Sequence, residues 1–147
     1  MFSQTAEYAL RAVAHLASRP DGMSTIPEMS RAIQVNAPYL RKVLDKLREQ
    51  GIVGTQRGTG GGTHLSVSPD DLTILDVLNA VDSLQRITSC PLGLPGHTKL
   101  CPLHSEVDEA IATVEKALGS RTIGELLSAR RNPGGCEFPK AADLYQL

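Results

Sequence analysis

The glycine-rich segment 51–67, together with the helix expected just before it, constrains the fold more than any other part of the chain. It reads GIVGTQRGTGGGTHLSV: an apolar run ends at Arg57, a glycine-rich tip follows, and alternation resumes with Leu65 and Val67. This pattern predicts a β-hairpin with a long, flexible and uncharged tip. Residues 38–50 form a basic amphipathic pattern directly before it. A helix followed by such a hairpin is typical of the wing of a winged helix-turn-helix, which predicts DNA binding.

Length and composition narrow the class of protein further. A chain of 147 residues can bury one core and carry an appended helical arm. No apolar run is long enough to span a membrane and no secretory pattern opens the chain, so we expect a cytoplasmic protein with no membrane partner. Residues 1–67 carry eight Lys and Arg against five Asp and Glu, whereas residues 68–147 carry seven against eleven. Since the net charge is −1, DNA binding requires a local basic face.

Apolar stripes and capping signals predict a mainly α fold around the hairpin. A stripe over 3–18 follows Ser3 as a cap, Thr25 begins a capping box that opens a short second helix, and a turn at 34–37 leads to a helix from about Pro38. Thr73 caps another short helix. We therefore expect a winged helix-turn-helix domain with a two-stranded wing over residues 1–82.

The second part of the chain combines a long loop with a long helix. Residues 83–103 show no periodicity, and a loop of that length in a compact domain is usually functional or disordered. From His104 an apolar stripe predicts a long helix, and Thr122 begins a second capping box that opens a short one, so residues 104–131 are expected to be helical and 132–147 to form a tail. The stripe consists of Val107, Ala110, Ile111, Val114, Ala117 and Leu118.

The DNA-reading surface should lie at the start of the second helix of the helix-turn-helix and in the wing. The helix would present its N-terminal residues to the major groove, with its two cations on guanine edges or phosphates. Arg57, where the wing begins, is expected in the minor groove, and the glycine tip would let the backbone approach the phosphates. A merely solvated helix face is the competing interpretation, which the order of helices and wing disfavours. The candidate DNA-binding residues are Ala37, Pro38, Tyr39, Arg41, Lys42, Arg57, Gly58, Thr59 and Gly60.

A group of cysteines and histidines lies in and just after the long loop. Cys90, His97, Cys101 and His104 fall within fifteen residues, and Cys101 and His104 bracket a helix start. Such a set suits a transition metal or an iron–sulfur cluster. The competing interpretation is two ordinary cysteines in a loop and a helix-capping histidine, and the spacing does not decide between them. Cys136 in the tail has no assigned role.

The chain resembles the Rrf2 family of bacterial transcription regulators over about residues 1–130. The resemblance rests on the segments 7–11 (EYALR), 39–48, 51–53 (GIV), 57–62 (RGTGGG) and 74–82. Members of this family are homodimers with a winged domain and a long crossed dimerisation helix. The resemblance therefore implies that the stripe from Val107 to Leu118 is the dimerisation helix and that the dimer binds a palindromic double-stranded DNA operator.

The resemblance also implies a cofactor. Sensing members hold an iron–sulfur cluster in the loop before the long helix, usually through three closely spaced cysteines. Here Cys90 matches the first and Cys101 the last, while the middle position falls near residues 95–97. His104, or alternatively His97, and Glu7 of the partner chain would complete four ligands for a [2Fe–2S] cluster. Glu7 also has a plainer role available, as an i, i+4 ion pair with Arg11 worth ~0.3 kcal/mol.

Mixed ligation of this kind has a chemical consequence. Replacing a thiolate by neutral imidazole raises the cluster potential, and an imidazole can take up a proton, so we expect a sensor of redox state, iron or nitric oxide. Three alternatives compete with this expectation. The same dimer could use its cysteines as a thiol switch or a zinc site, or it could serve a structural or partner-binding role. An enzyme using Cys101 as a nucleophile is disfavoured because no orienting acid or oxyanion-hole motif is evident.

Overall fold

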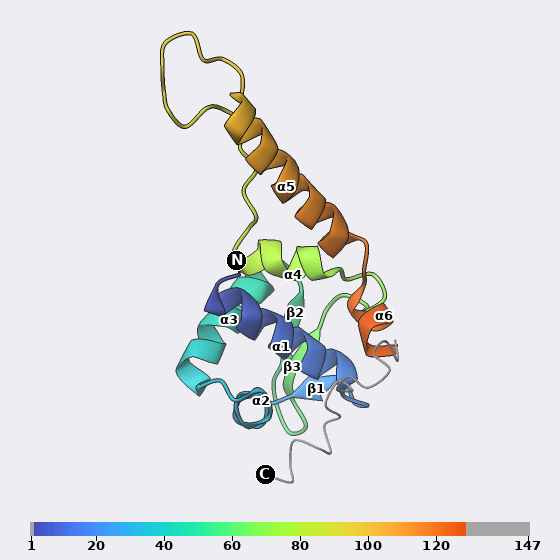
Figure 1. Cartoon of the computed structure of the whole chain (residues 1–147). Coiled ribbons are helices and arrows are strands. Elements are labelled where there is room, and N and C mark those ends of the chain that lie inside the picture. Colours follow the sequence, from blue (N-terminus) through green and yellow to red (C-terminus); the bar gives the residue numbers. More distant parts are fainter. Residues whose placement is uncertain (1, 129–147) are drawn as a thin grey trace.

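Helices and three short strands follow one another along residues 2–128, the part of the chain that this computed structural model describes (Figure 1). The expected tail over residues 132–147, which includes Cys136, lies outside the described residues. The elements are α1 (Gln4–Ser18), β1 (Met23–Ser24), α2 (Ile26–Ile33), α3 (Ala37–Glu49), β2 (Val53–Gln56), β3 (Gly62–Leu65), α4 (Ile74–Val81), α5 (Pro102–Gly119) and α6 (Ile123–Ser128).

Side-chain caps fix the helix starts that the sequence predicts. The Ser3 hydroxyl accepts a hydrogen bond from a backbone N–H in the first turn of α1. The hydroxyls of Thr25, Thr73 and Thr122 each accept a hydrogen bond from the backbone N–H of the third residue in the helix that follows. The side-chain carboxylate of that third residue accepts a hydrogen bond from the threonine's backbone N–H in return. These reciprocal bonds satisfy backbone donors that a helix start otherwise leaves unpaired.

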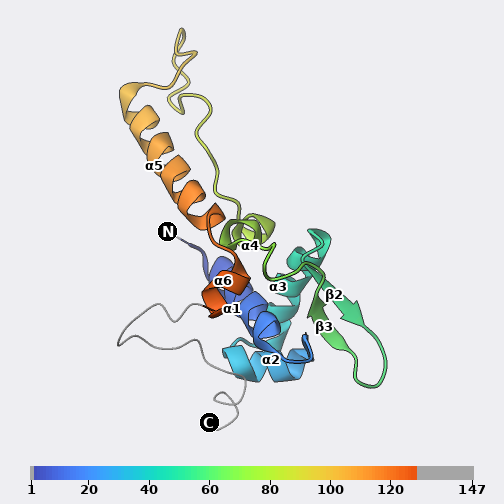
Figure 2. The same ribbon diagram turned by 90° about the vertical axis from the view of Figure 1, so that its right-hand side faces the viewer.

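The predicted wing is present, and it belongs to a three-stranded sheet. β2 and β3 pair antiparallel, with Val53 opposite Leu65 and Gln56 opposite Gly62. β1 is an addition to the sequence-based expectation: its two residues pair with β3, which gives the order β1-β3-β2. Two residues carry no periodic pattern, so only the pairing with β3 defines this strand. The β2–β3 hairpin extends away from the helices beside α3 (Figure 2).

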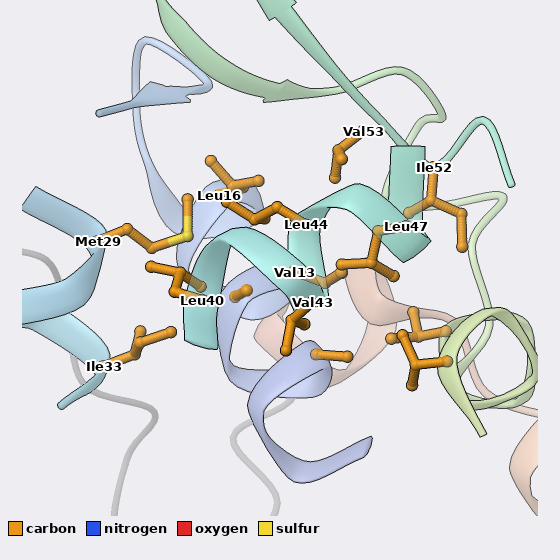
Figure 3. Packing of buried hydrophobic residues seen from close by; sticks show 14 of the residues in the cluster. Val13, Leu16, Met29, Ile33, Leu40, Val43, Leu44, Leu47, Ile52 and Val53 are labelled. Atoms are coloured by element: carbon orange, nitrogen blue, oxygen red, sulfur yellow. The ribbon is translucent and has the colours of Figure 1, made fainter. Parts of the chain in front are cut away.

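One apolar core joins the helices of the N-terminal part to the base of the wing (Figure 3). α3 lies at its centre, because the four apolar residues on its inner face are each exposed by 1% or less. Ile52 and Val53, at the start of the hairpin, are buried in the same cluster. The wing and α3 are therefore held in a fixed relation to each other. The other labelled core residues are Val13, Leu16, Met29, Ile33, Leu40, Val43, Leu44 and Leu47.

α5 projects away from this core, and a long segment without helix or strand connects it to α4 (Figures 1 and 2). The helix starts at Pro102, two residues earlier than the sequence pattern suggests, and none of its residues is buried. Val107, on the apolar stripe, is 43% exposed. α6 then returns to the domain, where the Ile123 N–H donates to the Leu72 carbonyl at 2.7 Å. None of the described helices is long and apolar enough to cross a bilayer.

Candidate nucleic-acid interface and candidate metal centre

The start of α3 is built as the recognition end of a helix-turn-helix. Gln34 adopts a left-handed conformation (φ 55°) at the end of α2 and so turns the chain toward α3. Asn36 then caps α3, because its side-chain oxygen accepts from the Tyr39 N–H at 2.9 Å. Arg41 and Lys42 follow on the exposed face of the helix. The candidate cations of α3 are thus displayed on the surface.

Tyr39 differs from the other candidate DNA-binding residues. Its hydroxyl lies 2.6 Å from the Thr5 hydroxyl oxygen, and its ring meets the Tyr8 ring edge-on with centroids 5.5 Å apart. Both partners belong to α1. The Tyr39 side chain therefore joins α3 to α1. The sequence did not reveal this role, because Tyr39 is far along the chain from both Thr5 and Tyr8.

The wing tip is exposed and its backbone needs glycine. Gly58 and Gly60 have positive φ values of 99° and 75°. A Cβ on Gly61 would collide with the Gln56 carbonyl oxygen, so a side chain there cannot be accommodated without moving the turn. Arg57 and Thr59 are exposed beside these glycines.

Arg48 connects the wing to the recognition helix. Its guanidinium bonds Asp45 at 2.7 Å on α3 and reaches the Thr55 hydroxyl of β2 at 3.3 Å. The sequence pattern predicted that Arg48 lies on a charged face of the helix. It did not predict the contact with β2, which forms only when the chain is folded.

Three of the predicted metal ligands come together at the N-terminal end of α5, the end away from the core. Cys101 is the N-cap of this helix, and His104 lies in its first turn. The His104 Nδ1 lies 3.1 Å from the Cys101 Sγ and 3.8 Å from the Cys90 Sγ. All three ligand atoms lie within 4.8 Å of one another, and Cys90 is only 7% exposed although its loop is mostly exposed.

The two other candidate ligands lie outside this group of three. His97 is exposed in the loop, where its N–H donates to the Leu94 carbonyl at 3.1 Å. Glu7 pairs with Arg11 at 3.0 Å on α1, and both side chains are about half exposed. α1 packs against α4 and α6 near the base of α5, whereas the three ligands lie at the opposite end of that helix (Figure 1). Glu7 is therefore far from the three ligand atoms of its own chain.

The donor set suits a transition metal. Ligand atoms 2.0–2.3 Å from a tetrahedral metal lie roughly 3.3–3.8 Å from one another, close to the two distances to His104. Thiolate and imidazole are the donors that zinc and iron–sulfur clusters take. Among the described residues no fourth Cys, His, Asp or Glu joins the group. The three donors thus form an open site that one further ligand would close.

An ion-pair network holds the segment before Cys90 on α5, and no pattern in the sequence predicts it. Arg86 binds Asp108 through two hydrogen bonds of 2.7 and 2.6 Å and reaches Glu115 at 3.5 Å. The Ile87 N–H donates to Asp108 as well, at 2.8 Å. The Arg86 guanidinium, helped by this N–H, lowers the pKa of Asp108 below its usual range.

Comparisons with known proteins agree with this arrangement of wing and helices. A family model described as Rrf2, iron-dependent transcriptional regulator, matches residues 2–129. A protein of Aquifex aeolicus (strain VF5), named as a candidate HTH-type transcriptional regulator, is 27% identical over 132 residues, which cover 87% of this chain and 92% of the relative.

Solved structures show the same fold. The structure of T. potens IscR has a TM-score of 0.75 at 19% identity, covering 94% of this chain and 93% of its own. The structure of CymR, the global cysteine regulator of B. subtilis, has a TM-score of 0.70 at 22% identity, covering 86% of this chain and 95% of its own.

Proposed function

The chain belongs to the Rrf2 family of transcriptional regulators, and on that basis we propose that it is a homodimer whose affinity for a palindromic operator depends on an iron–sulfur cluster. The cluster would be held by Cys90, Cys101 and His104. The observation that carries the proposal is the convergence of two thiols and one imidazole within 4.8 Å at the start of α5. Burial of Cys90 in an otherwise exposed loop supports it further.

DNA contacts in this proposal come from two exposed surfaces. Arg41 and Lys42 on α3 would meet guanine edges or phosphates in the major groove. Arg57 would enter the adjacent minor groove, while the glycine tip brings backbone N–H groups close to phosphates. The buried base of the wing and the Arg48 contact to β2 support a fixed spacing between these surfaces.

The cluster would need a fourth ligand, and we assign it to Glu7 of a second copy. A [2Fe–2S] cluster takes four protein ligands, of which this chain brings three together. Glu7 is half exposed and its present partner, Arg11, is an exposed cation, so little free energy opposes its release. A bound cluster would supply reversible one-electron chemistry at this site. Cys90, Cys101 and His104 would hold and orient it at the start of α5.

The arrangement also offers a route from the site to DNA. α5 carries the ligands at its start and the apolar stripe along its length. Val107, Ala110 and Ala117 of this stripe are exposed, Ile111 and Val114 are half-buried, and Leu118 packs against the core. If two copies cross through this stripe, a change at the site alters how the two α5 helices meet. The separation of the two α3 helices would follow, and a dimeric helix-turn-helix reads half-sites about one helical turn apart.

Iron and sulfide analysis of anaerobically purified protein tests the cofactor. We expect about two iron and two sulfide per chain with absorption in the visible, as a [2Fe–2S] centre requires. Cys101→Ala should lose both, because it removes a central donor, whereas Cys136→Ser should retain them. A colourless wild type without iron would contradict the proposal.

A second candidate is the same regulator with a zinc ion or a thiol switch. The separations of 3.8 and 3.1 Å between the His104 Nδ1 and the two cysteine sulfurs favour it, since they lie near the distances between neighbouring ligands of a single tetrahedral metal. Stoichiometric zinc in the wild type, lost in Cys101→Ala, would establish the zinc form. A metal-free wild type that forms a Cys90–Cys101 disulfide under mild oxidant would establish the switch.

A further inference from the structure

The segment between α4 and Cys90 is anchored at only two places among its described contacts. At its start, the Lys46 ammonium of α3 donates to the Val81 carbonyl at 2.9 Å. Near its end, Arg86 and the Ile87 N–H bind Asp108 of α5. No residue of 82–89 is buried, yet Cys90 is 7% exposed. Apolar burial of the segment therefore does not explain why Cys90 lies where it does.

The second anchor lies directly beside the ligand group. Asp108 is one helical turn beyond His104, so the two side chains share a face of α5. Only Thr88 and Ser89 separate Ile87 from Cys90. The segment runs antiparallel to α5, because Arg86 lies at Asp108 and Cys90 lies nearer the start of the helix (Figure 2). The fixed point at Asp108 thus confines Cys90 to the neighbourhood of Cys101 and His104.

We propose that Arg86 and Asp108 form a positioning clamp, which holds Cys90 beside Cys101 and His104 before any metal is bound. A two-pronged guanidinium–carboxylate pair has a defined geometry that an isolated ammonium cannot give. The additional bond from the Ile87 N–H fixes the backbone of the segment as well as the Arg86 side chain. Arg86 and Asp108 act through the segment and are not themselves ligands. The inference deepens the proposed function, since it concerns the same three-donor site.

The length of the tether sets the size of the effect. With the clamp in place, Cys90 is three positions along the chain from the anchored Ile87. Without it, the nearest anchor is Val81, nine positions from Cys90. The effective concentration of a tethered group falls as roughly the 3/2 power of tether length, so release should lower that of Cys90 about fivefold.

A thiol–disulfide equilibrium measures this concentration without any metal. Full-length Cys136→Ser protein, kept metal-free with a chelator, is equilibrated with reduced and oxidised glutathione. Oxidised glutathione accepts two electrons and is released as two glutathione thiols, while the Cys90 and Cys101 thiols join in a disulfide. We expect Arg86→Ala and Asp108→Ala to lower the effective concentration of the pair about fivefold. Arg86→Lys should fall in between, and the charge exchange Arg86→Asp with Asp108→Arg should restore part of the loss.

Glu109→Ala is the matched control, because it removes the same charge from the neighbouring exposed position of α5 without touching the clamp. It should behave as the parent protein, and helix content by circular dichroism should be equal in every variant compared. Unchanged effective concentrations in both clamp variants would overturn the proposal. So would an equal fall in Glu109→Ala, or a parent protein that forms no disulfide. Absence of iron from the wild type would contradict the proposed cluster but would leave this result standing.

Discussion

His15 shows how one residue links the stability of the domain to pH. It lies on α1 with 2% exposure, and its Nε2 is 3.1 Å from the Ser24 hydroxyl oxygen of β1. Burial lowers its pKa below the usual range, and the neighbouring Arg19 adds to this, against the opposing effects of Glu28 and Asp21. The folded chain therefore favours the neutral imidazole that joins α1 to the sheet.

The sign of the pH effect follows from that lowered pKa. As the pH falls below about 6.5, the unfolded chain binds a proton that the folded chain resists, so the free energy of unfolding decreases. Above that range the contribution is constant. We expect His15→Gln to weaken this loss between about pH 7.5 and 5.5, measured by urea unfolding at several pH values. Equal pH dependence of both proteins would contradict this role for His15.

The wing offers a test that separates the contribution of its tip backbone to DNA binding from that of the Arg57 side chain. Gly61→Ala places a Cβ against the Gln56 carbonyl and should distort the tip. Arg57→Ala leaves the turn intact and removes only the proposed base contact. We expect Arg57→Ala to weaken operator binding by ~1–3 kcal/mol and to relax sequence preference. Gly61→Ala should weaken binding to all sequences, because it shifts the backbone that approaches the phosphates.

The measurement is operator affinity at fixed salt, with thermal unfolding as the control for folding. Lys99→Ala, which removes a cation from the distant loop, should bind as the wild type does. Wild-type affinity in both wing variants would count against the assignment of this hairpin as a DNA contact.

The elements also show which parts of the fold the sequence can predict. The caps at Ser3, Thr25, Thr73 and Thr122 were predictable because each signal and its partner lie within three or four residues. The wing was predictable because alternation and a glycine tip are local too. β1 was not, since two residues gain a strand conformation only by pairing with β3.

Long-range polar contacts are the part of the site that the sequence does not predict. Cys101 and His104 could be paired from their spacing at a helix start, and Cys90 from the family resemblance. The Arg86–Asp108 pair joins residues twenty-two positions apart through a segment with no periodicity. The Tyr39 contact with Thr5 spans a still longer interval. Neither has a local pattern, so only the folded chain reveals them.

For the whole molecule, we propose that the apolar stripe of α5 is the surface through which two copies associate. The side of α5 that faces the segment between α4 and Cys90 carries His104, Asp108 and Glu115, which leaves Val107 and Ala110 exposed on an adjacent side. We expect a mass of twice the chain's 15.7 kDa by sedimentation equilibrium. Val114→Glu should shift it toward the monomer, because it places a charge in an apolar interface.

Thr113→Glu is the control for that variant, since it adds the same charge at the neighbouring exposed position, on another side of α5. It should remain dimeric. A dimer unaffected by Val114→Glu would contradict the assignment of this stripe as the interface. Loss of operator binding together with dimerisation would connect the interface to the function.

If the three-donor site controls DNA affinity, as we propose, loading and removing its metal must change how tightly the dimer binds its operator. An operator is first selected from a random-sequence DNA pool with the wild-type dimer. The affinity for this operator is then measured for protein purified anaerobically with its metal and for the same protein after the metal is removed by a chelator. Cys101→Ala is measured in the same way, as a variant whose affinity should not depend on the metal. The account predicts a change of at least about fivefold in the wild type, the lower end of allosteric coupling, and none in Cys101→Ala. Equal affinities of the two wild-type forms would contradict it.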